Sequence, residues 1–144
     1  EDRKKALSTI KFNAAIKVDD SIVSVFSPYP STVLYNISVE KGFIKPPIDY
    51  TQPTFLDQPN FSKTEVAFFA VYFSFLRRLY KYFGENSTIG KLLDRIILSK
   101  NLPIRFLISI GENYALAISN LKTLIRNYTP GIFRFLRKIL KRQL

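Results

Sequence analysis

The stretch from residue 61 to 84 constrains the fold most, because helix start and stop signals enclose an almost continuous apolar run. Ser62 and Glu65 form an S-x-x-E capping box, and Gly84 is placed to end the helix. Residues 66–73 are all apolar, which is far short of the roughly 20 residues that a helix needs to cross a bilayer. A helix that is apolar nearly all round lies either among other helices or in lipid. This length favours burial among other helices.

Three further helices are predicted after the first one. Apolar residues recur at helical spacing over about 88–100, 103–127 and 129–144. Gly111 is placed to kink or split the second of these. Because the connections are short, neighbouring helices should be antiparallel. The fold class is therefore predicted to be mainly α, with a bundle of about four helices over residues 61–144.

Residues 1–60 are predicted to form a separate region, an extended and proline-rich N-terminal arm. Six of the eight prolines lie here, which excludes a long regular helix or a central strand around them. Residues 41–60 are too apolar for a solvated linker, so they form either a strap on another subunit or a loop over the chain's own helices. Residues 21–26 and 32–40 look extended and predict short β segments, in a hairpin or on another subunit. For residues 1–17, a helix and a frayed charged terminus are both open.

Charge is distributed unevenly, and the formal net charge of +11 belongs entirely to residues 61–144. That region has fifteen basic and four acidic residues, whereas residues 1–60 have seven of each. Salt bridges within the helices cannot balance such an excess, so it indicates a polyanionic partner, either nucleic acid or an anionic membrane surface. The cations expected to contact phosphates are Arg134, Arg137, Lys138, Lys141, Arg142, Arg77, Arg78 and Lys81. No base-reading motif is present, so the binding is expected to be non-specific.

No catalytic signature accompanies this charge. Cysteine and histidine are both absent, which removes thiolate nucleophiles and the commonest general base and metal ligand. The five glycines stand alone and form no phosphate-binding loop. With only four acidic residues in the helical part, the sequence predicts no enzyme, no cofactor and no metal site.

In its layout the chain resembles the coat proteins of filamentous archaeal viruses of the rudivirus, lipothrixvirus and tristromavirus kind. The resemblance rests on the arm at 1–60 and on a bundle that runs from FSKTEVAFFAVYFSFLRRLYKYFG through TPGIFRFLRKILKRQL. Those coat proteins are small, basic, cysteine-poor helical bundles with N-terminal extensions. The resemblance implies a virion protein that assembles, alone or with a related second coat chain, around double-stranded DNA, with a membrane as a neighbour in enveloped particles. Because no signature motif is matched, it implies architecture and partner class only.

Two other functions fit the same features. A long arm and a basic bundle also suit a subunit of a large ribonucleoprotein, such as a ribosomal or organellar protein. A membrane-surface or membrane-complex protein would place the aromatic helix of residues 62–83 against lipid and its cations on headgroups. For a coat protein, deletion of residues 1–45 is expected to spare the helicity of the bundle but to block assembly.

Overall fold

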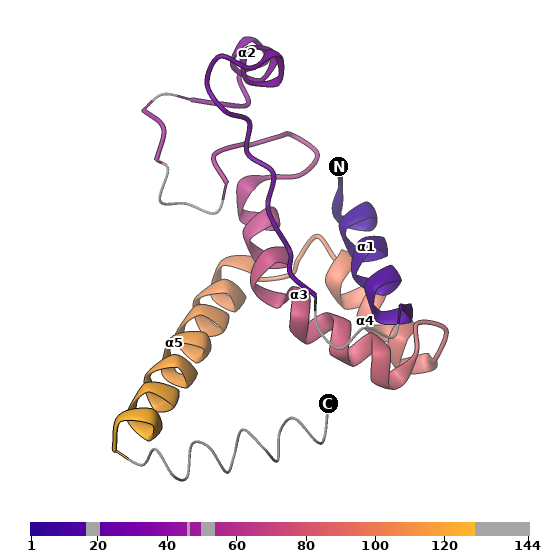
Figure 1. Cartoon of the computed structure of the whole chain (residues 1–144). Coiled ribbons are helices and arrows are strands. Elements are labelled where there is room, and N and C mark those ends of the chain that lie inside the picture. Colours follow the sequence, from indigo (N-terminus) through magenta and orange to yellow (C-terminus); the bar gives the residue numbers. More distant parts are fainter. Residues whose placement is uncertain (17–20, 46, 50–53, 129–144) are drawn as a thin grey trace. The chain divides into compact units, whose positions relative to one another are not determined.

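The computed structural model describes residues 1–16, 21–45, 47–49 and 54–128. The described chain is mainly helical, which confirms the prediction of a mainly α fold, and it contains no β-strand. Its contacts divide it into a first unit, residues 1–108, and a second unit, residues 109–144. In chain order the helices are α1 (Arg3–Ala15), α2 (Val33–Glu40), α3 (Lys63–Phe83), α4 (Thr88–Leu98) and α5 (Ile104–Tyr128), as labelled in Figure 1.

Helix α3 begins and ends where the sequence predicts. The Ser62 hydroxyl accepts a hydrogen bond from the Glu65 amide, and the Glu65 carboxylate accepts one from the Ser62 amide at 2.7 Å. These reciprocal bonds satisfy two of the backbone donors that a helix start leaves unpaired. Gly84 ends the helix with φ at 80°, a left-handed conformation that glycine adopts without a steric penalty. The capping-box prediction is confirmed.

Helices α4 and α5 also agree with the prediction. The Ser87 hydroxyl caps α4 by accepting from the Gly90 amide at 2.9 Å. Gly90 is buried so close to the preceding loop that an added Cβ would lie 2.4 Å from the Gly84 carbonyl oxygen, so no larger residue fits there without a shift. Helix α5 is continuous through Gly111, which excludes a split at that residue. The predicted helix at 129–144 lies outside the described residues.

The prediction of a β segment over residues 32–40 is wrong. Residues 33–40 form helix α2, which Thr32 starts by accepting from the Tyr35 amide at 3.2 Å and donating to the Tyr29 carbonyl at 2.7 Å. The alternation of residue types over this segment is compatible with either structure, and a strand gains its stability only from a neighbouring strand. Residues 21–26 are extended but belong to no ladder among the described residues. Because the described residues offer no partner strand, the cap at Thr32 is sufficient to favour the helix.

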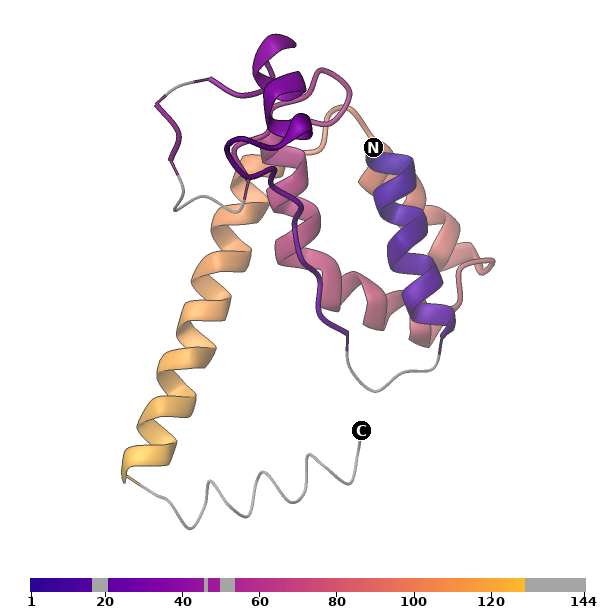
Figure 2. The ribbon, with the colours of Figure 1, turned by 45° about the horizontal axis from the view of Figure 1, so that its top comes forward.

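The N-terminal segment is a helix and belongs to the packed core of the first unit. Asp2 caps α1 by accepting from the Lys5 amide at 2.9 Å. Four residues of α1 are buried: Ala6, Leu7, Ile10 and Ala14. Figures 1 and 2 show α1 alongside α3 and α4. Of the two alternatives for this segment, the helix is therefore confirmed, and it is not part of an extended arm.

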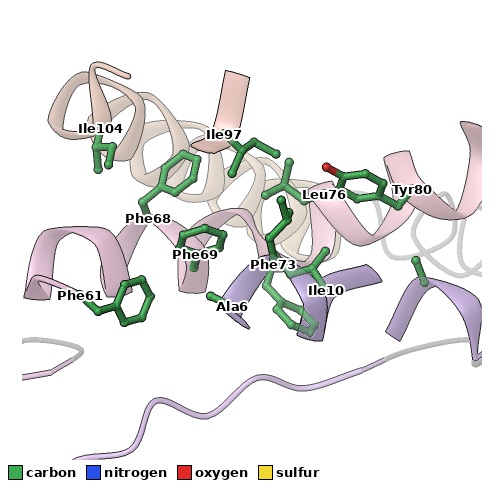
Figure 3. Close-up of a cluster of buried hydrophobic side chains, with 12 residues drawn as sticks. Ala6, Ile10, Phe61, Phe68, Phe69, Phe73, Leu76, Tyr80, Ile97 and Ile104 are labelled. Atoms are coloured by element: carbon green, nitrogen blue, oxygen red, sulfur yellow. The ribbon is translucent and has the colours of Figure 1, made fainter. Parts of the chain in front are cut away.

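Aromatic side chains of α3 form the centre of this core (Figure 3). Phe68 and Phe69 meet edge to face with 5.4 Å between their ring centroids, a favourable geometry for aromatic pairs. Figure 3 shows Ala6 and Ile10 on one side of the α3 side chains, with Ile97 and Ile104 on the other. In the first unit, α1 therefore covers one side of α3, although the sequence prediction placed residues 1–17 in the arm.

The proline-rich stretch lies partly against its own chain. Ile44 and Thr54 are buried, and the Asp57 amide donates to the Phe43 carbonyl at 2.9 Å. Phe55 and Leu56 are half-buried. These contacts agree with the loop alternative for the described part of 41–60, while a strap on another subunit stays a prediction.

Candidate nucleic-acid interface

Two ion pairs fix α1 to the following helices. Arg3 pairs with the Glu65 carboxylate at the start of α3, and its Nη1 also donates to the Ser99 carbonyl at 2.7 Å. At the other end of α1, Lys11 Nζ lies 2.6 Å from Asp94 Oδ2 of α4. Because both pairs are partly buried, they contribute more than exposed ion pairs do.

Asp94 also joins α3 to α4. Its second carboxylate oxygen accepts a hydrogen bond from the Tyr80 hydroxyl at 2.7 Å, and Lys11 Nζ lies 5.4 Å from the centre of the Tyr80 ring. Burial, together with the bond to Asp94, raises the pKa of the Tyr80 hydroxyl above its ordinary value. Tyr80 therefore remains a neutral donor throughout the physiological pH range.

The electrostatics of Glu65 reflect its two roles. Burial by itself raises the pKa of the Glu65 carboxyl, but hydrogen bonds from the Ser62 amide, from Arg3 and from the Ser62 hydroxyl outweigh burial. The net result is a pKa below the ordinary value of a glutamate. Glu65 is therefore ionised at neutral pH, where it caps α3 and pairs with Arg3.

The two ion pairs of α1 affect the charge balance of the later helices. Two of the four acidic residues in 61–144, Glu65 and Asp94, are used to bind cations of α1, so they do not balance the later helices. The cations that remain exposed on the described part of α3, α4 and α5 and on their connections are Lys63, Arg78, Lys81, Lys91, Arg95, Lys100 and Arg105. The positive charge exposed on these helices is therefore only partly balanced by their own acidic residues.

Three of the eight predicted phosphate contacts lie in the described chain. Arg78 and Lys81 are exposed and lie one turn apart on α3. Arg77, in contrast, has only 3% of its surface exposed and is not available to an external phosphate in this structure. Arg77 follows Phe73 by four residues and precedes Tyr80 by three, so helical spacing alone places it on the buried face. The other five residues, in 129–144, lie outside the described residues.

The sequence analysis missed two aromatic residues beside these cations. Phe75 and Tyr82 are exposed and flank Arg78 at spacings of three and four, which places all three on one side of α3. We name Phe75, Arg78, Lys81 and Tyr82 the α3 outer face. Exposed aromatic rings next to cations favour contacts with unstacked bases as well as with phosphates. The signal was present in the sequence, because these residues lie opposite the buried Phe69, Phe73 and Tyr80.

Metal-binding clusters and membrane-spanning helices can be looked for directly in the described residues. Among them, no cluster of acidic side chains could hold a metal ion. No helix within the described ranges is long and apolar enough to cross a membrane.

Stability should depend on pH through Glu65. Because its folded-state pKa is lowered, its contribution is complete above the ordinary glutamate pKa and is lost as the pH falls through the folded pKa. We expect Glu65→Gln to cost about 1 kcal/mol in the free energy of unfolding at neutral pH, and this gap to shrink in acid. Urea unfolding over a pH series measures it. The control is Glu85→Gln, an exposed carboxylate just after α3, which should cost nothing; a gap that persists in acid would contradict the prediction.

Comparisons of the sequence and structure with protein-family models, curated proteins and solved structures found no match.

Proposed function

We propose that this protein is a structural subunit that packages double-stranded DNA in a helical virion by binding phosphates without reading sequence. The observation that carries the proposal is the exposed cationic surface of the described part of α3–α5, where two of the four acidic residues, Glu65 and Asp94, are paired with α1. Such a surface binds phosphates through charge and counterion release.

The finer architecture also belongs to this proposal. The basic helix predicted at 129–144 would join α5 and complete a bundle of about four helices in the assembled particle. Exposed apolar side chains on α5, among them Tyr114 and Leu121, support a further packing partner for this helix. Copies of this chain, or a related second coat chain, would supply the remaining contacts, and a membrane would be a neighbour only in an enveloped particle.

The salt dependence of DNA affinity tests the phosphate contacts. We expect the double variant Arg78→Gln with Lys81→Gln to flatten the log–log slope of affinity against salt by up to about two units, because each phosphate that the protein no longer neutralises lowers the slope by about one. The matched control is Lys41→Gln with Lys45→Gln, which removes the same charge from two exposed lysines of the first sixty residues.

Further variants define the extent of the surface. Replacing Arg134, Arg137, Lys138 and Lys141 with Gln should flatten the slope further if these residues extend the same surface. An unchanged slope in both sets of variants would show that these cations face something other than DNA. Equal flattening by the lysine control would show that net charge alone matters.

A single-stranded nucleic acid is the second candidate partner, and the exposed rings of Phe75 and Tyr82 favour it. This partner corresponds to a subunit of a large ribonucleoprotein. Titration with a duplex and with a single-stranded RNA of equal length separates the two candidates. Electron micrographs of native particles separate them independently, because a coat protein forms uniform filaments in which this chain predominates, whereas a ribonucleoprotein contains it once.

A further inference from the structure

Helix α2 lies in an uncharged stretch whose apolar side chains are exposed to solvent. Residues 21–39 contain no charged residue, and α2 itself buries no residue in the described structure. Val33, Leu34 and Ile37 are all exposed, with 74% of the Val33 surface accessible. A helix of eight residues is marginally stable in water by itself. Besides its cap, a surface that covers the apolar side chains of α2 would therefore stabilise it.

Helix α4 offers a surface of matching character. Its inner side buries Gly90 and Ile97, whereas its outer side exposes Ile89, Leu92 and Ile96 at spacings of three and four. These three residues, which we name the α4 outer stripe, form a continuous apolar strip along one side of the helix. Solvent-facing strips of this kind mark sites of association.

The two cations beside the α4 outer stripe favour a partner that carries an acidic group. Lys91 and Arg95, four residues apart, are exposed beside it and form no ion pair with any described residue. Like charges at this spacing repel each other, so an acidic group between them is favourable. Glu40, the last residue of α2, is exposed and is the only charged residue between positions 21 and 40.

A copy of this chain carries a net charge of +11, so two copies repel each other overall. The stretch of residues 21–39 is uncharged and is followed by Glu40, so it does not add to this repulsion. We propose that α2 of one copy docks on the α4 outer stripe of the next, with its Glu40 beside Lys91 and Arg95. The proposal rests on the self-association in the proposed function and names its contact.

The geometry of this contact has a consequence for assembly. The two surfaces, α2 and the α4 outer stripe, are different parts of one chain, so two copies joined by a single such contact each keep one surface unoccupied, whereas a reciprocal exchange of both contacts would close a twofold dimer. Such a heterologous contact propagates into an open filament or closes into a ring, whereas a contact of like surfaces ends at a dimer. The proposed contact is therefore of the kind that a helical particle requires.

Complementation between two variants tests the proposal. Leu34→Asp blocks α2 and Leu92→Asp blocks the α4 outer stripe; both side chains are exposed, so neither change should disturb folding. In sedimentation experiments without nucleic acid, we expect the wild type to form chains or rings and each variant alone to be monomeric. An equimolar mixture should give dimers of one copy of each variant and nothing larger, because only one compatible pair of surfaces remains.

Charge exchange provides the second measurement. Glu40→Lys alone, or Lys91→Glu with Arg95→Glu alone, should weaken association by roughly tenfold or more, and combining all three changes should restore it. Exposed Glu85→Lys is the matched control and should leave association unchanged. Monomeric wild type, homodimers of a single variant or a mixture without dimers would overturn the α2–α4 contact. The salt slope of DNA affinity, measured on the monomeric variants, reports on the proposed function independently of that result.

Discussion

Removal of residues 1–16 is expected to abolish the cooperative unfolding transition of this protein. The deletion strips α1 from α3, where Leu7 and Ile10 are almost fully buried, with 3% and 1% of their surfaces exposed. Burying each such side chain contributes about 1.5–3 kcal/mol, and the deletion also exposes the α3 aromatics and leaves Glu65 and Asp94 without Arg3 and Lys11. A typical domain has a net stability of only about 5–15 kcal/mol, so the combined loss is comparable to the total.

Point variants on α1 separate loss of packing from loss of chain length. Ile10→Ala should cost about 2–5 kcal/mol, because it leaves a cavity against α3. Phe12→Ala, two residues away on the same helix, should cost little, because 66% of the Phe12 surface is exposed. Thermal unfolding followed by circular dichroism measures both. A deletion variant that still melts cooperatively near the wild-type temperature would show that α1 is dispensable.

This expectation reverses the one drawn from sequence. Deletion of residues 1–45 was expected to spare the helicity of the bundle, because the first sixty residues are electrically neutral and rich in proline. The structure argues against its premise, because the prolines all follow α1 and residues of α1 belong to the core. Loss of folding in the deletion would therefore report on the core and not on assembly.

Local signals explain the parts of the fold that the sequence predicted well. The box of Ser62 and Glu65, the cap at Ser87 and the restart after Pro103 each act within a few residues, so they can be recognised along the chain. Helix α2 shows the limit of such signals. Its pattern fits a strand and a helix equally well, and the choice depends on whether a neighbouring strand exists elsewhere in the chain.

Contacts between distant residues explain what the sequence did not reveal. Arg3 pairs with Glu65 over 62 positions, and Lys11 pairs with Asp94 over 83. No pattern along the chain identifies such partners, so the sequence could show that cations exceed acids but not that two of those acids are already occupied. For the candidate site, helical spacing would have been sufficient to find Phe75 and Tyr82 and to place Arg77 inside, because α3 has one clearly buried side, but the sequence prediction did not use it.

The buried and exposed sides of α3 can be compared by replacing a phenylalanine on each side. Phe73 has 5% of its surface exposed and Phe75 has 56%, although only one residue separates them. We expect Phe73→Ala to cost about 3–5 kcal/mol in the free energy of unfolding, because it opens a cavity between α3 and α1. Phe75→Ala should change stability by less than about 0.5 kcal/mol, because its ring faces solvent.

Nucleic-acid binding should show the opposite order for this pair. Phe75→Ala removes a ring from the α3 outer face, and each base stacked on an aromatic side chain contributes about 1–3 kcal/mol. Affinity for a single strand should therefore fall roughly fivefold or more, while affinity for a duplex stays nearly constant because its bases are already stacked. Urea unfolding and fluorescence titration on the same preparations measure both effects. Equal losses for duplex and single strand would mean that Phe75 positions the neighbouring cations; no loss for either would leave phosphate binding to Arg78 and Lys81 alone and would favour the duplex.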